Sequence, residues 1–147
     1  EFIDTDDAIE EVTEMKVADI FREFGENKFR EMETAFFIEK AKQSGQVFST
    51  GGGIVLGAET RKVLRENGTT FLLDASPATL AKRIHNTSKR PLLTESDNLE
   101  AQLQKIWDER KGYYKESAHH IIATDELQPE GVIGEIIKIL GVQVADH

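Results

Sequence analysis

Short apolar runs alternate with longer amphipathic segments along the whole chain. Strands are predicted at Phe2-Ile3 and over residues 46–49, 70–73 and 120–123, where the apolar residues are nearly continuous. Helices are predicted where apolar residues recur at helical spacing, over residues 4–13, 17–24, 26–44, 58–66, 76–86, 98–118 and 131–140. Strands that alternate with helices are typical of a mostly parallel sheet covered by helices on both faces. The predicted fold class is therefore α/β, in a single domain over residues 1–147.

The third and the last of these helices carry apolar side chains that recur on one face. These side chains are predicted to point into the core: Phe29, Met32, Phe36, Phe37, Ile133, Ile136, Ile137 and Leu140. Gly25 and Gly45 are predicted to end helices, because glycine readily adopts the left-handed conformation found there. Ser76-Pro77 is predicted to begin one, with serine as the cap and proline in the first turn.

Polar residues and glycines follow the predicted strands. Asp4, Gly51, Asp74 and Thr124 all fall at the carboxyl ends of strands, which is where parallel sheets of this class bind ligands. The run Gly51-Gly52-Gly53 removes every Cβ from a strand-to-helix turn. A backbone without side chains can approach a ligand closely, and its N–H groups can converge on an anion.

The amino-acid composition excludes several kinds of binding partner and chemistry. The 147 residues carry a net charge of −9, which argues against a nucleic-acid surface because such surfaces are usually basic. Cysteine is absent, so disulfides and thiolate catalysis are excluded. The four histidines lack the spacing of a zinc site, and no apolar run is long enough to span a membrane. We therefore expect a cytoplasmic protein, or a plastid one in a plant, that is monomeric and binds neither nucleic acid nor membrane.

Two acidic and two basic side chains are candidates for binding a ligand. Asp4 and Asp6 lie at a strand–helix boundary, where acids commonly cap the helix, but they could also organise Mg²⁺ and accept a hydrogen bond from a hydroxyl. Arg30 and Arg110 lie on helices, where an arginine is commonly solvated or paired with an acid such as Glu33. From these residues alone, both interpretations stay open.

Residues 87–97 are predicted to form a polar lid that carries the run Lys89-Arg90-Pro91-Leu92-Leu93. An arginine on such a lid can close on developing phosphate charge, and Arg83 on the preceding helix could face the same ligand. The glycine run also permits a dinucleotide-binding interpretation with Asp74 as the acidic residue. However, Gly57 follows Gly53 one residue later than that fingerprint requires.

Taken in order, these motifs resemble the shikimate kinase family, from Glu1 to about Leu140. The residues that carry the resemblance are Phe2-Ile3-Asp4-Thr5-Asp6, Ala18-Asp19-Ile20-Phe21, Gly25-Glu26, Phe29-Arg30-Glu31, Glu33, Thr50-Gly51-Gly52-Gly53, Arg90-Pro91-Leu92-Leu93, and Arg110 with Tyr114. The resemblance implies a P-loop-kinase-like fold of the nucleoside-monophosphate-kinase type. It also implies a transferase of aromatic amino-acid synthesis that moves the γ-phosphoryl group of ATP, with Mg²⁺, to the 3-hydroxyl of shikimate.

The resemblance further implies a role for each candidate residue. Asp6 would hold the 3-hydroxyl as base or orienter, Asp4 would hold Mg²⁺ through water, and Arg90 would close on the transferring phosphoryl group. The substrate carboxylate would lie between Arg30 and Arg110. The other residues implied at the substrate are Gly52, Gly53, Phe21, Phe29, Pro91 and Leu92, and those implied at the adenine are Arg83 and Pro129.

The sequence departs from this family in one feature. Such kinases open with a strand, a G-x-x-x-x-G-K-[ST] loop and a helix, but none of the 11 glycines here is followed by lysine. The absent strand lies inside the sheet in the family, so two inner strand edges should stay unpaired beside a gap in the core. We expect the 147-residue chain itself not to transfer phosphate from ATP. Three explanations stay open. The chain could be part of a kinase, it could be a kinase-like module that binds a small carboxylate or a protein, or another chain could supply the missing strand, loop and helix.

Overall fold

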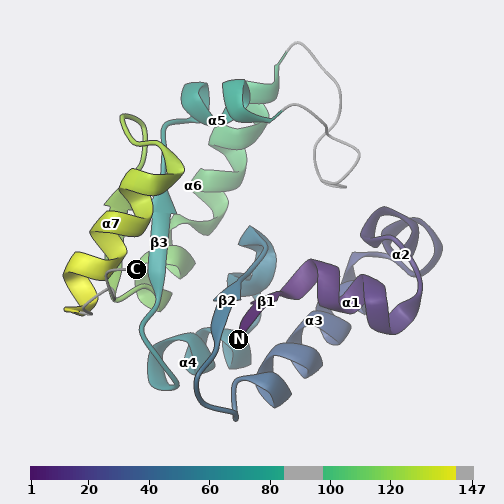
Figure 1. The fold of residues 1–147 in the computed structure, drawn as a ribbon. Helices are drawn as coiled ribbons and strands as arrows, with labels where there is room; N and C mark the ends of the chain where they lie inside the picture. The colour runs from purple at the N-terminus through teal and green to yellow at the C-terminus, as the bar shows by residue number, and fades with distance from the viewer. Residues whose placement is uncertain (85–97, 142–147) are drawn as a thin grey trace.

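The computed structural model describes residues 1–84 and 98–141, and it has the predicted α/β fold (Figure 1). The strands are β1 (Phe2–Asp4), β2 (Val47–Ser49), β3 (Phe71–Asp74) and β4 (His120–Ala123). The helices are α1 (Thr5–Thr13), α2 (Val17–Phe24), α3 (Glu26–Lys40), the 3₁₀ helix η1 (Gly52–Leu56), α4 (Ala58–Glu66), α5 (Pro77–Arg83), α6 (Leu99–Ser117) and α7 (Pro129–Leu140). The predicted lid, with Arg90, Pro91 and Leu92, lies outside the described residues.

The four strands form two separate parallel pairs rather than one sheet. In the first pair Ile3 of β1 lies opposite Phe48 of β2, and in the second Leu72 of β3 lies opposite Ile121 of β4. No ladder joins the two pairs within residues 1–84 and 98–141, so each pair keeps a free inner edge. The interruption expected from the sequence is therefore present between the two halves of the fold.

Local chemistry explains where the first helices begin and end. The Asp4 carboxylate caps α1, because its Oδ1 accepts a hydrogen bond from the Asp7 N–H at 3.0 Å. Gly25 has a φ of 85°, which side-chain-bearing residues rarely adopt, and it both ends α2 and precedes α3. The sharp α2–α3 corner that results packs α1, α2 and α3 together beside the β1–β2 pair (Figure 1).

The buried core divides into two clusters. One contains Ile9, Val17, Ile20 and Phe29 from the first three helices. The other contains Phe37, Ile54 and Val55, and joins α3 to η1. The prediction for α3 is confirmed, because Phe29 and Phe37 are fully buried and Met32 and Phe36 pack against the first cluster. This half of the molecule holds α3 and η1 at the end of the β1–β2 pair.

The predictions for the other half are only partly correct. Ile133 and Leu140 of α7 are 56% and 46% exposed, so they do not point into a core, whereas Ile136 and Ile137 are half-buried. Leu73 in β3 is 52% exposed, although this strand was predicted to be buried. Leu73 lines the open space between the two strand pairs, so their separation leaves this face of β3 without a complete covering layer.

One exposed carboxylate joins β4 to the start of α5. Asp125 Oδ1 accepts hydrogen bonds from the Ser76 N–H at 3.0 Å, the Ser76 hydroxyl at 2.8 Å and the Thr79 hydroxyl at 2.7 Å. These bonds favour the ionised form and lower the pKa of Asp125 from 3.8 to about 2. Its contribution to stability is therefore complete above about pH 4 and is lost as the pH falls through about 2.

Replacing Asp125 with alanine should therefore lower the melting temperature at neutral pH and flatten its fall between about pH 4 and pH 2. Melting curves followed by circular dichroism across this range test the prediction. Glu126→Ala is the matched control, because it removes the neighbouring acidic side chain. Equal pH profiles for the wild-type chain and Asp125→Ala would contradict the assignment.

Candidate substrate site

Most of the predicted site residues line one open cavity of about 980 Å³, which extends from the carboxyl ends of the strands along the whole of β3. The cavity extends between the two strand pairs, so Phe48 from β2 and Leu72 from β3 both line it. The site residues predicted from the sequence that line it are Asp6, Phe21, Phe29, Arg30, Gly52, Gly53, Arg83 and Arg110. Residues from α1, α3, η1 and α6 thus share one site.

Each glycine of the turn faces a different polar side chain of the site. A Cβ added to Gly51 would lie 3.4 Å from Asp6 Oδ2, and one added to Gly52 would lie 2.8 Å from the Tyr114 hydroxyl oxygen. A Cβ added to Gly53 would overlap the guanidinium group of Arg30. The absence of side chains at these positions is therefore what lets the acid, the phenol and the guanidinium converge on the backbone.

Arg30 is fixed by acids of its own helix and by aromatic rings. Its Nη1 lies 3.0 Å from Glu33 Oε1, its Nε lies 3.5 Å from Glu26 Oε1, and its guanidinium carbon lies 5.2 Å from the centre of the Phe29 ring. Glu33 is 2% exposed, and burial raises the pKa of its carboxyl while the Arg30 charge opposes the shift. Arg30 is therefore held in one position, but a neighbouring acid already offsets much of its charge.

Asp6 retains unused capacity to accept a hydrogen bond. Its Oδ1 is buried and has no hydrogen-bond partner among residues 1–84 and 98–141. Burial raises the pKa of the Asp6 carboxyl, the nearby Asp4 charge raises it further, and the Arg30 charge lowers it. A half-buried carboxylate that lines the cavity and has a raised pKa is suited to accepting a proton from a ligand hydroxyl.

Arg110 differs from Arg30 in having no acid of the described residues at ion-pair distance, although its charge reaches the Glu33 carboxyl and lowers the pKa of that group. It is 9% exposed on α6 and forms no ion pair with any described residue. One turn further along α6, the Tyr114 hydroxyl donates a hydrogen bond to the Gly52 carbonyl at 2.9 Å, and the Trp107 ring stacks on Tyr114. A nearly buried guanidinium that forms no ion pair in the described part of the chain favours an anionic ligand in this cavity.

Three predicted site residues lie elsewhere or are engaged in other contacts, and a fourth falls outside the described residues. Asp4 caps α1 and does not line the cavity, and Pro129 begins α7 away from it. Arg83 lines the cavity, but its guanidinium donates to the Thr124 hydroxyl at 2.9 Å and to the Thr124 carbonyl at 2.6 Å. Arg90 lies outside the described residues. The roles predicted for these residues stay predictions.

The sequence interpretation named Glu33 as a partner for Arg30 and Tyr114 among the family motifs, but it assigned neither of them a place in the site, and it did not consider Trp107 there. Helical spacing is the signal for the last two, since Tyr114 follows Arg110 by four residues and Trp107 precedes it by three. The described residues include no cluster of three or more potential metal ligands. Within the same residues, no helix is both long enough and apolar enough to cross a membrane.

Comparison with known proteins identifies the family. The family model described as shikimate kinase matches residues 1–141. The chain belongs to the shikimate kinase family. It is 38% identical over 138 residues to the shikimate kinase of Thermodesulfovibrio yellowstonii, which covers 94% of this chain and 79% of that protein. It is 37% identical over 143 residues to the shikimate kinase of Caldanaerobacter subterraneus subsp. tengcongensis, covering 95% of this chain and 83% of that protein.

Solved structures of shikimate kinases share the fold. Shikimate kinase from Acinetobacter baumannii in complex with shikimate matches with a TM-score of 0.89 at 30% identity, over 95% of this chain and 78% of that one. The enzyme from Bacteroides thetaiotaomicron matches with a TM-score of 0.85 at 29% identity, over 96% and 84%. The protein is therefore a kinase-type transferase of the shikimate family, as the sequence motifs predicted.

Proposed function

We propose that this cavity binds shikimate and presents its 3-hydroxyl to the γ-phosphoryl group of ATP. The observation that carries the proposal is the meeting of Asp6, Arg30 and Arg110 around a side-chain-free turn in one cavity. Family membership and the solved A. baumannii complex with shikimate support it. No finding favours a non-catalytic module or a dinucleotide-binding site.

The two arginines divide the binding of the substrate carboxylate unequally. Arg110 forms no ion pair in the described part of the chain and meets the Glu33 charge only at longer range, so it supplies more of the positive charge for the carboxylate than Arg30 does. Arg30 is paired with Glu33 and adds oriented N–H donors more than net charge. The rings of Phe21 and Phe29, 5.0 Å apart, offer an apolar wall for the carbon ring of shikimate.

Asp6 lines the cavity, and its carboxylate accepts the hydrogen bond of the 3-hydroxyl. The raised pKa of the Asp6 carboxyl makes it a better acceptor for the proton that the 3-hydroxyl loses during phosphoryl transfer. Phosphoryl transfer depends mostly on positioning and on stabilising charge, so holding this oxygen in place matters more than strong basicity. The roles of Arg90 at the phosphoryl group, and of Arg83 and Pro129 at the adenine, complete the proposal.

The residues around Asp6 fit a hydrated Mg²⁺. Asp4 and Asp6 are close enough for the Asp4 charge to raise the pKa of Asp6, and carboxylate oxygens are the ligands Mg²⁺ prefers. Asp4 would hold the ion through water, because its Oδ1 already caps α1. When bound, the ion would neutralise phosphate charge. The expectation that the 147-residue chain is inactive with ATP stays a prediction, since it contains no G-x-x-x-x-G-K-[ST] loop.

Titration calorimetry of the 147-residue chain tests the substrate. Shikimate should bind with a dissociation constant of about 1 mM or below, in the range usual for enzyme substrates. Its methyl ester should bind at least about tenfold more weakly, because it lacks the negative charge that the arginines recognise. The same samples, given ATP and Mg²⁺, should form no shikimate phosphate. A folded chain that binds neither compound would refute the proposed substrate.

A further inference from the structure

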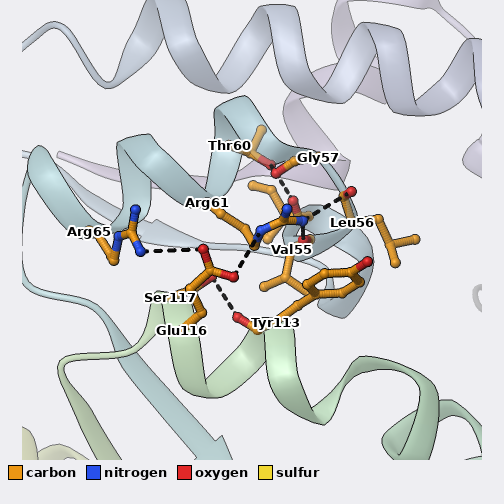
Figure 2. A network of polar contacts seen from close by, with 10 residues as sticks. Val55, Leu56, Gly57, Thr60, Arg61, Arg65, Tyr113, Glu116 and Ser117 are labelled. Atoms are coloured by element: carbon orange, nitrogen blue, oxygen red, sulfur yellow. Dashed lines mark hydrogen bonds and ion pairs between the residues drawn. The ribbon is translucent and has the colours of Figure 1, made fainter.

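The glycine turn continues into η1, and side chains from α4 bind the carbonyl groups at the carboxyl end of η1. Arg61 Nη1 donates to the Val55 carbonyl at 2.7 Å and to the Leu56 carbonyl at 3.2 Å (Figure 2). The Thr60 hydroxyl lies within hydrogen-bonding distance of the carbonyls of Ile54 and Gly57. Because η1 is a short 3₁₀ helix with few ladder bonds, these side chains decide its conformation.

Arg61 also contacts α6 on its other side. Its Nε lies 3.4 Å from Glu116 Oε2, and its guanidinium carbon lies 4.2 Å from the centre of the Tyr113 ring (Figure 2). The Arg61 side chain is only 15% exposed, so both contacts are partly shielded from water. One planar group thus joins the glycine turn to the helix that carries Arg110.

This connection matters because the proposed site is divided between these two elements. The turn contributes Gly52 and Gly53, and α6 contributes Arg110 and Tyr114. Neither Arg61 nor Glu116 lines the cavity, so neither can touch a ligand there. Any effect of these residues on binding must act through the relative position of the turn and the helix.

We propose that Arg61, with Glu116 as its partner, is a positioning residue that sets the distance between the glycine turn and Arg110 in the shikimate site. The assignment of shikimate rests on the proposed function above, but the connection between the turn and α6 does not. A guanidinium suits this position because its Nη1 donates to the carbonyls while its charge stays within ion-pair distance of Glu116 and its face stacks on Tyr113. A lysine ammonium has no such flat face.

Arg61→Met is the decisive variant, because it keeps an unbranched apolar side chain and removes every donor. Arg65→Met is its matched control. Arg65 lies on the same helix and pairs with the same Glu116, at 3.3 Å, but makes no hydrogen bond to the turn. Both variants lose one positive charge and one contact with Glu116, so a difference between them reflects the contacts made by Arg61 alone, with the carbonyls of η1 and the Tyr113 ring.

Two measurements on the 147-residue chain give independent results. Arg61→Met should weaken shikimate binding by roughly ten- to a hundredfold, since small displacements of binding groups have effects of this size. It should also speed hydrogen exchange of the Gly53, Ile54 and Val55 amides by at least about tenfold. Arg65→Met should change neither quantity more than about twofold, and Arg61→Lys should recover less than half of the lost binding free energy.

The outcomes separate this proposal from the proposed function. If the wild-type chain binds no shikimate, the proposed substrate fails, and the exchange rates alone decide whether Arg61 holds the turn. If Arg61→Met matches Arg65→Met in exchange, the proposal is overturned. It is also overturned if the turn loosens while shikimate affinity stays within about twofold of the wild type. Circular dichroism must show that each variant remains folded.

Discussion

Replacing Gly53 with alanine should reduce shikimate affinity at least about a hundredfold, or about 2.7 kcal/mol. The added methyl group would occupy the volume of the Arg30 guanidinium, so Arg30 would have to leave its place between the turn and Glu33. Both the backbone surface and one of the two guanidinium groups would then be lost from the site. Titration calorimetry with shikimate measures the effect.

The fold should survive this substitution. Displacing Arg30 leaves the buried Glu33 without its cation, which would be costly for an ionised carboxylate. However, burial already raises the pKa of Glu33, so the group can take up a proton and avoid most of that cost. The melting temperature of Gly53→Ala should accordingly fall with rising pH more steeply than that of the wild type.

Gly68→Ala is the control for this experiment. A Cβ at Gly68 meets no atom within 4 Å, and its φ lies outside the range that disfavours side chains. Its shikimate affinity should remain within about twofold of the wild type. If Gly53→Ala also binds shikimate normally, Arg30 does not need to lie against the turn, and the proposed geometry of the site is wrong.

The placement of a site residue was predictable wherever strand order or helical spacing fixes both where the residue lies and which way its side chain points. Asp6 and Gly53 follow neighbouring parallel strands, and the carboxyl ends of such strands must share one edge. The pairing of Arg30 with Glu33 follows from their spacing on one helix. By contrast, the hydrogen bond from Tyr114 to the Gly52 carbonyl joins residues 62 positions apart. Nothing local specifies such a contact.

The errors in the predicted core have a different origin. Helical spacing shows which face of α7 is apolar, but it does not show whether another element covers that face. Ile133 and Leu140 lie on this face and remain largely exposed. The same limit applies to Leu73, since a continuous apolar run predicts burial only if the sheet is complete on both sides. Whether an apolar face is buried depends on how all the elements pack together, so the sequence of a single segment does not determine it.

Arg110→Ala should weaken shikimate binding without lowering the stability of the protein. The substitution removes the guanidinium that forms no ion pair among the described residues, so shikimate affinity should fall at least about a hundredfold. Each charge-assisted hydrogen bond to a carboxylate contributes about 1.5–3 kcal/mol, and the fork of an arginine can form two. Arg110→Lys should restore only part of the loss, because an ammonium cannot bind in that bidentate manner.

Stability should respond with the opposite sign to affinity. In the free protein, Arg110 is a nearly buried cation beside an open cavity, and removing such a charge relieves a desolvation penalty. We expect the melting temperature of Arg110→Ala to stay unchanged or to rise by about 2–4 °C per kcal/mol relieved. Lys111→Ala, which removes the next cation along α6 at an exposed position, should alter neither quantity. A loss of affinity accompanied by an equal loss of stability would instead make Arg110 a structural residue, with no special role toward an anionic substrate.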